Sequence, residues 1–185
     1  MLRTRVGYAG GTTEAPTYRD LGDHTEALQI EFDTRVISYD DLLEVFWAAH
    51  DPFARPWSRQ YRAVVWTHDE AQARAVRATI VDLEGDGERR VATAVEPATR
   101  FWIAEAYHQK YALQSRRGLR AALFGEDADD VVFRESTLAA RVNGWIAGHG
   151  SASEIAAQLD ALGVPEPLRK ALASYLGDRA PLSCR

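Results

Sequence analysis

Glu26 is the residue whose type and position most directly suggest chemistry. Side chains two positions apart on a β-strand share a face, and residues 26–32 alternate in this way. One face of this segment is apolar, formed by Leu28, Ile30 and Phe32. By parity Glu26 belongs to that face, where a carboxylate is unfavourable unless it is paired or protonated. Because burial favours the protonated form, Glu26 is a candidate proton donor at the rim of a cleft.

The surroundings of Glu26 leave a second interpretation open. The ends of helices and strands are the least certain part of an assignment from sequence. If the strand begins one residue later, Glu26 is an ordinary solvated residue of the preceding loop.

The other reactive side chains form no metal or hydrolase pattern. The five histidines are dispersed, and no pair has the i, i+4 helical spacing of a zinc site. We therefore expect hydrogen-bonded histidines and no bound metal. The only cysteine, Cys184, precedes the last residue, so no disulfide can form within these 185 residues. Any thiol chemistry of this chain must come from that position.

Strand and helix signals alternate along the first two thirds of the chain. Four strands are predicted by alternating and β-branched stretches, at residues 2–8, 26–32, 61–66 and 91–97. Capping signals at Ser38 and at Thr67 start two helices, and residues 104–123 predict a further run of helix. The fold class of residues 3–123 is therefore expected to be α+β, a mixed sheet packed with helices.

The composition shifts toward Ala, Leu and Gly from Phe133 onward. Glycines separate three short helical patterns there, and Ser151 with Glu154 has the spacing of a capping box. Residues 133–185 are expected to be a C-terminal helical extension with a mobile tail. Its apolar helix faces either pack on the body or dock a partner, and packing is the simpler expectation.

Charge and hydropathy exclude two classes of partner. The formal net charge is -5 and the pI is near 5.6, whereas nucleic-acid binders usually show a basic patch and a high pI. No apolar run is long enough to cross a membrane, and the first residues lack a signal-peptide core. We expect no nucleic acid, no membrane and a cytoplasmic location.

Five blocks in the first 113 residues resemble the peptide methionine sulfoxide reductase A family. They are TRVGYAGG, PTYRDLGDHTEALQIEFD, ISYDDLLEVFWAAHDP, RQYRAVVW and AEAYHQKY, in that order. The resemblance implies a ferredoxin-like two-layer core. It also implies reduction of methionine S-sulfoxide, free or in proteins, by a cysteine that passes through a sulfenic acid and a disulfide. Thioredoxin or another dithiol would supply the reducing equivalents, and no cofactor is implied.

The resemblance also assigns roles to residues of this sequence. Glu26 matches the family's acid, the proton donor to the departing oxygen. Tyr18 and Tyr61 match the two tyrosines whose hydroxyl groups hydrogen-bond near the sulfoxide oxygen and place the substrate. Cys184 is a possible resolving cysteine, because resolving cysteines of the family often lie toward the C-terminus on mobile segments.

The sequence departs from the family pattern in two places. The family's nucleophile lies in a Gly-Cys-Phe-Trp-Gly block upstream of TRVGYAGG, and the 185 residues do not contain that block. Before Gln60, the stretch FARPWSR replaces a longer loop, so the family's substrate-orienting aspartate has no clear match. We expect a truncated copy of a reductase; the alternative is a non-catalytic relative that binds methionine sulfoxide or a partner protein.

Overall fold

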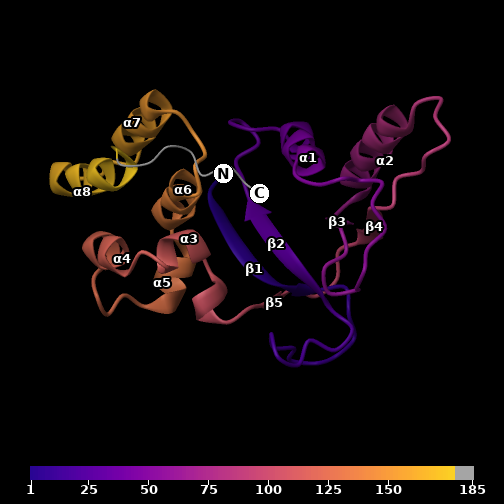
Figure 1. Ribbon diagram of the computed structural model, residues 1–185, viewed down its shortest axis with the longest axis horizontal. Coiled ribbons are helices and arrows are strands. Elements are labelled where there is room, and N and C mark those ends of the chain that lie inside the picture. Colours follow the sequence, from indigo (N-terminus) through magenta and orange to yellow (C-terminus); the bar gives the residue numbers. More distant parts are fainter. Residues whose placement is uncertain (178–185) are drawn as a thin grey trace. The chain divides into compact units, whose positions relative to one another are not determined.

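The computed structural model describes residues 1–177, which form two compact units (Figure 1). The first unit contains Met1 and Val6–Ala104, and the second contains Leu2–Arg5 and the chain from Glu105 onward. Strands and helices alternate in the first unit, while the second is almost entirely helical. The predicted α+β class is confirmed.

The strands form two small sheets. In the first, β1 (Arg3–Ala9) lies between β2 (Thr25–Glu31) and β5 (Trp102–Ile103), and it pairs antiparallel with β5. In the second, β3 (Val64–Thr67) and β4 (Ala94–Pro97) pair in parallel. The sequence predicts one mixed sheet, whereas the described strands form two. In the described residues, β2 therefore lies at an edge of its own sheet.

Two helices accompany these sheets. The helix α1 (Tyr39–Ala48) begins at Ser38, and the predicted capping box with Asp41 is present. The helix α2 (Glu70–Glu84) begins at Asp69, whose side chain accepts a hydrogen bond from the Gln72 amide. The prediction of Thr67 as the cap was wrong, because Thr67 still belongs to β3. The two helices bury Leu43, Trp47 and Val76 in a shared core.

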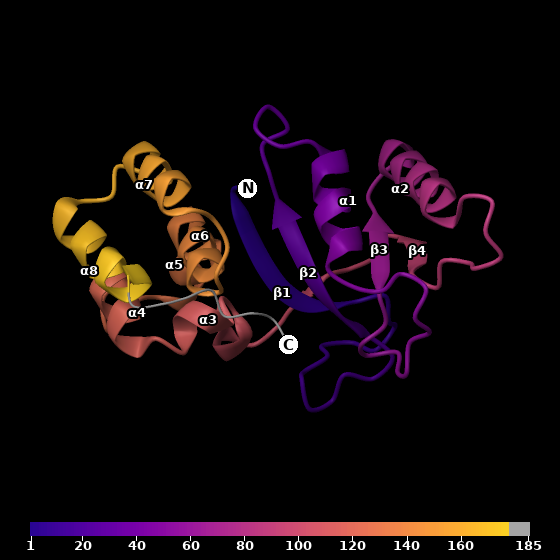
Figure 2. The same ribbon diagram turned by 45° about the horizontal axis from the view of Figure 1, so that its top comes forward.

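The apolar face predicted for β2 is not buried throughout. Leu28 is 58% exposed, and the other residues of the strand, apart from buried Thr25, are only half-buried. Figure 1 and Figure 2 both show α1 between β2 and the sheet of β3 and β4. Because β2 is an edge strand, alternation along its sequence does not by itself determine which side chains are covered.

The helical unit begins with a broken segment rather than the continuous helix predicted for residues 104–123. A 3₁₀ turn, η1 (Ala106–His108), is followed by α3 (Tyr111–Gln114) and α4 (Arg117–Phe124). Lys110 separates η1 from α3 and has a left-handed backbone (φ 49°), which an α-helix cannot contain. The buried Lys110 ammonium donates hydrogen bonds to the carbonyl oxygens of Thr4 and Arg134.

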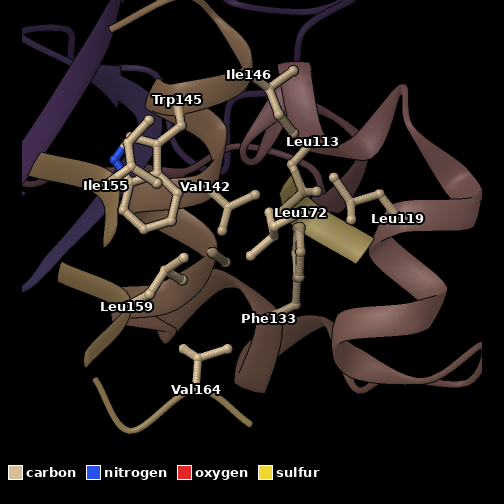
Figure 3. Packing of buried hydrophobic residues seen from close by; sticks show 11 residues of the cluster. Leu113, Leu119, Phe133, Val142, Trp145, Ile146, Ile155, Leu159, Val164 and Leu172 are labelled. Carbon is tan, nitrogen blue, oxygen red and sulfur yellow. The ribbon is translucent and has the colours of Figure 1, made fainter. Parts of the chain in front are cut away.

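Four further helices complete the unit: α5 (Asp130–Glu135), α6 (Thr137–Ile146), α7 (Ala152–Ala161) and α8 (Glu166–Gly177). Three of these are the helices predicted from the sequence, and α5 was missed. Figure 3 shows side chains from α3, α5, α6 and α8 meeting in one core, with Phe133, Val142 and Leu172 at its centre. These three side chains are almost inaccessible to solvent.

Within residues 1–177, none of the helices combines the length and the apolar composition that a membrane crossing needs. Cys184 lies outside the described residues.

Candidate functional site

The carboxylate of Glu26 is held near the start of β2 by Gln60. The side-chain amide of Gln60 donates from Nε2 to Glu26 Oε1 at 2.8 Å. The main chains of the same two residues are also joined, since Glu26 N donates to the Gln60 carbonyl oxygen at 3.0 Å. Glu26 is half-buried and lies within β2, one residue after its start. The interpretation of Glu26 as a solvated residue of the preceding loop is therefore excluded.

Two more contacts tie the start of β2 to residues 59–62. The Thr25 hydroxyl donates to the Arg59 carbonyl oxygen at 2.9 Å and accepts from Arg62 Nε at 3.0 Å. The Arg62 guanidinium also forms an ion pair with Glu96, which holds the pKa of that carboxyl below its usual range. Opposite charges held at hydrogen-bond distance fix side-chain geometry, so Arg62 anchors this turn to β4.

Tyr61 stands beside Glu26 because of this arrangement. Its hydroxyl oxygen accepts a hydrogen bond from Gln60 Nε2 at 3.0 Å. A hydrogen bond with Tyr18 raises the pKa of Tyr61, with smaller contributions from burial and from the Glu26 charge. Tyr61 was predicted within a strand, but it lies in the turn before β3. The turn is what leaves its ring 45% exposed beside the carboxylate.

Tyr18 reaches Tyr61 from the loop between β1 and β2. This loop is closed by His24, whose Nδ1 accepts from Gly11 N at 3.2 Å and whose Nε2 lies 2.8 Å from the Thr13 carbonyl oxygen. Asp23 accepts hydrogen bonds from the amides and hydroxyl groups of Thr12 and Thr13. These amides lower the pKa of Asp23 far below its usual value, so it remains ionised and holds the loop together.

Gly11 is required in this loop by close approach rather than by its backbone angles. A Cβ atom at Gly11 would lie 2.6 Å from Asp23 Oδ1 and 2.7 Å from the His24 ring. Both distances are shorter than van der Waals contact. A larger residue would therefore displace the two side chains that order the loop carrying Tyr18.

An exposed aromatic side chain, Trp57, lies against Tyr61. The Trp57 ring is 5.0 Å from the Tyr61 ring between centroids, with 30° between the planes. Trp57 is 81% exposed, so it contributes little to the core. Its position leaves an exposed aromatic surface beside the Tyr61 ring.

A groove of about 370 Å³ adjoins Glu26 within the first unit. Its lining is mostly apolar and includes Leu28 of β2, Phe46 of α1 and Phe101 before β5. Arg62 and Glu26 supply charge at this groove. A carboxyl group at the edge of an apolar groove suits a ligand with both a polar and an apolar part.

The structure thus brings three of the four sequence-predicted site residues together. Tyr18, Glu26 and Tyr61 are linked through hydrogen bonds in which Gln60 takes part. The fourth, Cys184, lies outside the described residues. Sequence reasoning missed both Gln60 and Trp57. An exposed tryptophan in a short Pro-containing loop was an available signal for Trp57, whereas the role of Gln60 depends on contacts across 34 positions of the chain.

Comparison with known proteins gives one consistent family. Residues 1–137 match the family described as "Peptide methionine sulfoxide reductase". A Drosophila melanogaster protein named peptide methionine sulfoxide reductase is 37% identical over 175 residues, covering 92% of this chain and 69% of the relative. Peptide methionine sulfoxide reductase A5 of Oryza sativa subsp. japonica is 39% identical over 153 residues, covering 80% of this chain and 59% of the relative.

Among solved structures, Mxr1 from Saccharomyces cerevisiae in reduced form resembles this fold. Its TM-score is 0.56 at 26% identity, over 62% of this chain and 72% of that chain. The likeness therefore concerns the larger part of both chains, and some of each relative has no counterpart in these 185 residues.

Proposed function

The chain belongs to the peptide methionine sulfoxide reductase family, and we propose that its site reduces methionine S-sulfoxide to methionine, as a peptide-methionine (S)-S-oxide reductase. The observation that carries this proposal is the placement of Glu26 and Tyr61 on the same amide of Gln60. A carboxyl group and a phenol side by side suit an oxygen that must be bound and then protonated.

The proposed chemistry needs a proton and a thiolate at the same time. The thiolate attacks the sulfoxide sulfur and forms a sulfur–sulfur bond while the oxygen takes up a proton. The hydroxyl group then moves to the attacking sulfur as the original sulfur–oxygen bond and the new sulfur–sulfur bond both break, which leaves a sulfenic acid and releases methionine. Glu26 protonates the sulfoxide oxygen, which is otherwise a poor leaving group. Tyr18 and Tyr61 orient that oxygen by hydrogen bonds. A second thiol then displaces water from the sulfenic acid and forms a disulfide.

The apolar part of the substrate fits the exposed aromatic surface next to this pair. Trp57, whose ring lies 5.0 Å from that of Tyr61, would cover the thioether carbons while the sulfoxide oxygen faces Glu26. Aromatic rings make favourable contacts with sulfur and with methyl groups beside it. This arrangement would favour sulfoxide over more polar ligands of similar size.

We propose thioredoxin or another dithiol as the reductant, acting in the cytoplasm. Cys184 is the only cysteine of the 185 residues, and we propose it as a resolving cysteine. A cysteine in this role needs a separate nucleophile to form a disulfide with.

The experiment compares the chain with and without the family's nucleophilic cysteine. Reduction of a peptide carrying methionine S-sulfoxide is measured with dithiothreitol for two forms of the protein: the 185-residue chain, and the same chain extended by the family's Gly-Cys-Phe-Trp-Gly segment. We expect turnover of the S epimer in the extended form, with the R epimer untouched. Glu26→Gln should lower the rate about 100- to 10,000-fold, the usual contribution of a general acid.

The matched control is Glu31→Gln, the same substitution on the same strand, and it should leave the rate unchanged. A Glu26→Gln rate equal to that of the parent would remove Glu26 as the acid. Calorimetric binding of methionine sulfoxide without turnover in either form would instead identify a non-catalytic sulfoxide-binding protein.

A further inference from the structure

The amide of Gln60 touches both the proposed acid and the proposed oxygen-binding hydroxyl. Its nitrogen lies 2.8 Å from Glu26 Oε1 and 3.0 Å from the hydroxyl oxygen of Tyr61. A side-chain amide has two N–H hydrogens, enough for one hydrogen bond to each of these oxygens. Both donors of Gln60 are therefore used within the site.

These two hydrogen bonds also determine which atoms remain for a ligand. Because Glu26 Oε1 accepts from Gln60, a proton on the carboxyl group belongs on Oε2. Because the Tyr61 oxygen accepts from Gln60, the Tyr61 hydrogen points away from Gln60, and the hydrogen bond with Tyr18 directs it toward Tyr18. One acceptor oxygen of a ligand can then meet the Oε2 proton and the hydroxyl pair of Tyr18 and Tyr61 together, since the Glu26 carboxyl and the Tyr61 phenol both lie within hydrogen-bond distance of one nitrogen.

The amide is not needed to hold the turn itself. The main-chain bond from Glu26 N to the Gln60 carbonyl oxygen, at 3.0 Å, already joins β2 to this turn. The contacts of Thr25 with Arg59 and Arg62 do the same one residue earlier. The side-chain amide of Gln60 adds alignment to a turn whose backbone is fixed by other bonds.

We propose that Gln60 is a positioning residue that aligns the Glu26 carboxyl and the Tyr61 hydroxyl on the oxygen of a bound sulfoxide. This role rests on the proposed function. It extends that function by assigning part of the selectivity for sulfoxide to the Gln60 amide, which acts through Glu26 and Tyr61. A thioether ligand has no such oxygen, so the alignment acts on sulfoxide binding alone.

The test uses the 185-residue chain and measures binding, so it needs no nucleophile. Dissociation constants for N-acetylmethionine S-sulfoxide amide and for its thioether are measured by calorimetry, and their ratio is the selectivity. Gln60→Met keeps the length of the side chain and removes the amide, while Gln60→Asn keeps the amide and shortens its reach. We expect either variant to lower the selectivity about 5- to 10-fold, the loss typical of one or two misaligned hydrogen bonds.

A second comparison distinguishes a positioning role of Gln60 from a purely structural one. It makes the Gln60 substitution in a protein whose Glu26 and Tyr61 have already been changed. In a Glu26→Gln, Tyr61→Phe double variant, Gln60→Met should have no further effect on selectivity, because both groups that it aligns have already been changed. An additional loss of equal size in that background would show that Gln60 acts through the fold and would overturn the proposal. Gln158→Met, in the helical unit where Gln158 accepts from Arg141, is the matched control and should keep the parent selectivity.

The Tyr61 phenol gives a second, ligand-free readout. Gln60 donates to the Tyr61 oxygen, and this contact lowers the pKa of Tyr61 against the larger effects that raise it. Gln60→Met should therefore raise the pKa of Tyr61 further, as followed by ultraviolet titration with Tyr61→Phe to assign the signal. An unchanged titration would contradict the shared hydrogen bond.

The measured preferences for sulfoxide over thioether also distinguish a failure of the role of Gln60 from a failure of the proposed function. If the parent chain prefers sulfoxide over thioether and Gln60→Met keeps that preference, only the role of Gln60 is overturned. If the parent chain shows no preference, the proposed function fails first.

Discussion

Tyr61 is hydrogen-bonded to Tyr18, and this contact is the largest cause of its raised pKa. The two tyrosines come from different segments, one from the loop before β2 and one from the turn before β3. A hydrogen bond that stabilises the protonated phenol makes it a donor across the whole neutral range. Tyr61 therefore presents a hydroxyl group rather than phenolate charge beside Glu26.

Tyr18→Phe should lower the pKa of Tyr61 toward its usual value near 10. The reason is that the substitution removes the largest contribution to the upward shift. Ultraviolet titration between pH 8 and 12 measures it, because ionised tyrosine absorbs at longer wavelength. Tyr111→Phe, at a 71% exposed position of the helical unit, is the control and should leave the Tyr61 transition in place. An unshifted Tyr61 transition in Tyr18→Phe would show that the two hydroxyl groups do not interact in solution.

Trp57→Ala should weaken binding of a methionine sulfoxide peptide several-fold while leaving the stability of the fold almost unchanged. Trp57 is 81% exposed and its ring contacts the Tyr61 ring in a tilted arrangement, so its loss opens no cavity. A single aromatic contact contributes about 0.5–1.5 kcal/mol, which sets the size of the effect. Calorimetric titration measures it, with the similarly exposed Val36→Ala as control. Equal affinity in Trp57→Ala and the parent would show that the substrate does not use this ring.

Gly11→Ala should destabilise the first unit by about 1–3 kcal/mol, the usual cost of overpacking a closely packed site. The new methyl group would meet Asp23 and His24 at distances below 3 Å. Gly144→Ala in α6 is the matched control. Apart from its two chain neighbours and the backbone of its own helix, no described atom lies within 4 Å of the position that a Cβ atom would take there, so we expect a gain of about 0.5–1 kcal/mol from helix propensity.

Urea unfolding followed by tryptophan fluorescence gives both free energies. A Gly11→Ala protein as stable as the parent would mean that the loop can shift without loss. Because the loop carries Tyr18, we also expect Gly11→Ala to weaken sulfoxide binding more than Gly144→Ala does.

Glu135→Gln should remove a pH-dependent part of the stability of the helical unit. Hydrogen bonds from Arg5, and further ones from Arg134 and Arg3, lower the pKa of Glu135 from 4.5 to about 2. A carboxyl group with a depressed pKa contributes stability above its unfolded pKa, and the contribution is lost as the pH falls through the folded pKa. The parent should therefore exceed Glu135→Gln in unfolding free energy above pH 4.5, and the difference should shrink between pH 4.5 and 2.

The control for this prediction is Glu166→Gln in α8. Its partner Lys170 is 4.0 Å away and both side chains are largely exposed, so the pair should contribute little at any pH. A parent-to-Glu135→Gln difference that is constant from pH 6 to 2 would show that the three arginines do not bind an ionised carboxylate.

Local signals in the sequence predicted the start of a helix correctly where the capping interaction joins residues close in sequence. The capping boxes at Ser38 and Ser151 join residues three apart, and both are present. The same kind of signal failed at Thr67, because the strand continues through Thr67 and Asp69 caps the helix instead. The break at Lys110 was not predictable from helix propensity, since its left-handed backbone is accompanied by contacts with Thr4 and Arg134, which are distant in sequence.

The residues of the candidate site also fall into two groups, those that the sequence could identify and those that depend on contacts between distant segments. Parity pointed to Glu26, and the family resemblance pointed to Glu26, Tyr18 and Tyr61, which the structure brings together. Parity was wrong about Leu28, because burial on an edge strand depends on which elements cover it. Gln60 could not be selected, since an amide beside a tyrosine in sequence carries no sign of the carboxylate that it meets in space.

The position of β2 at the edge of its sheet has a consequence for handling the protein. A strand at the edge of a sheet can associate with the edge of another molecule, and an exposed leucine such as Leu28 favours that association. Natural edge strands are often protected by an outward lysine, and Leu28→Lys would introduce one. Concentrated samples of the 185-residue chain should therefore aggregate by way of this strand, and the lysine variant should remain dispersed in light scattering.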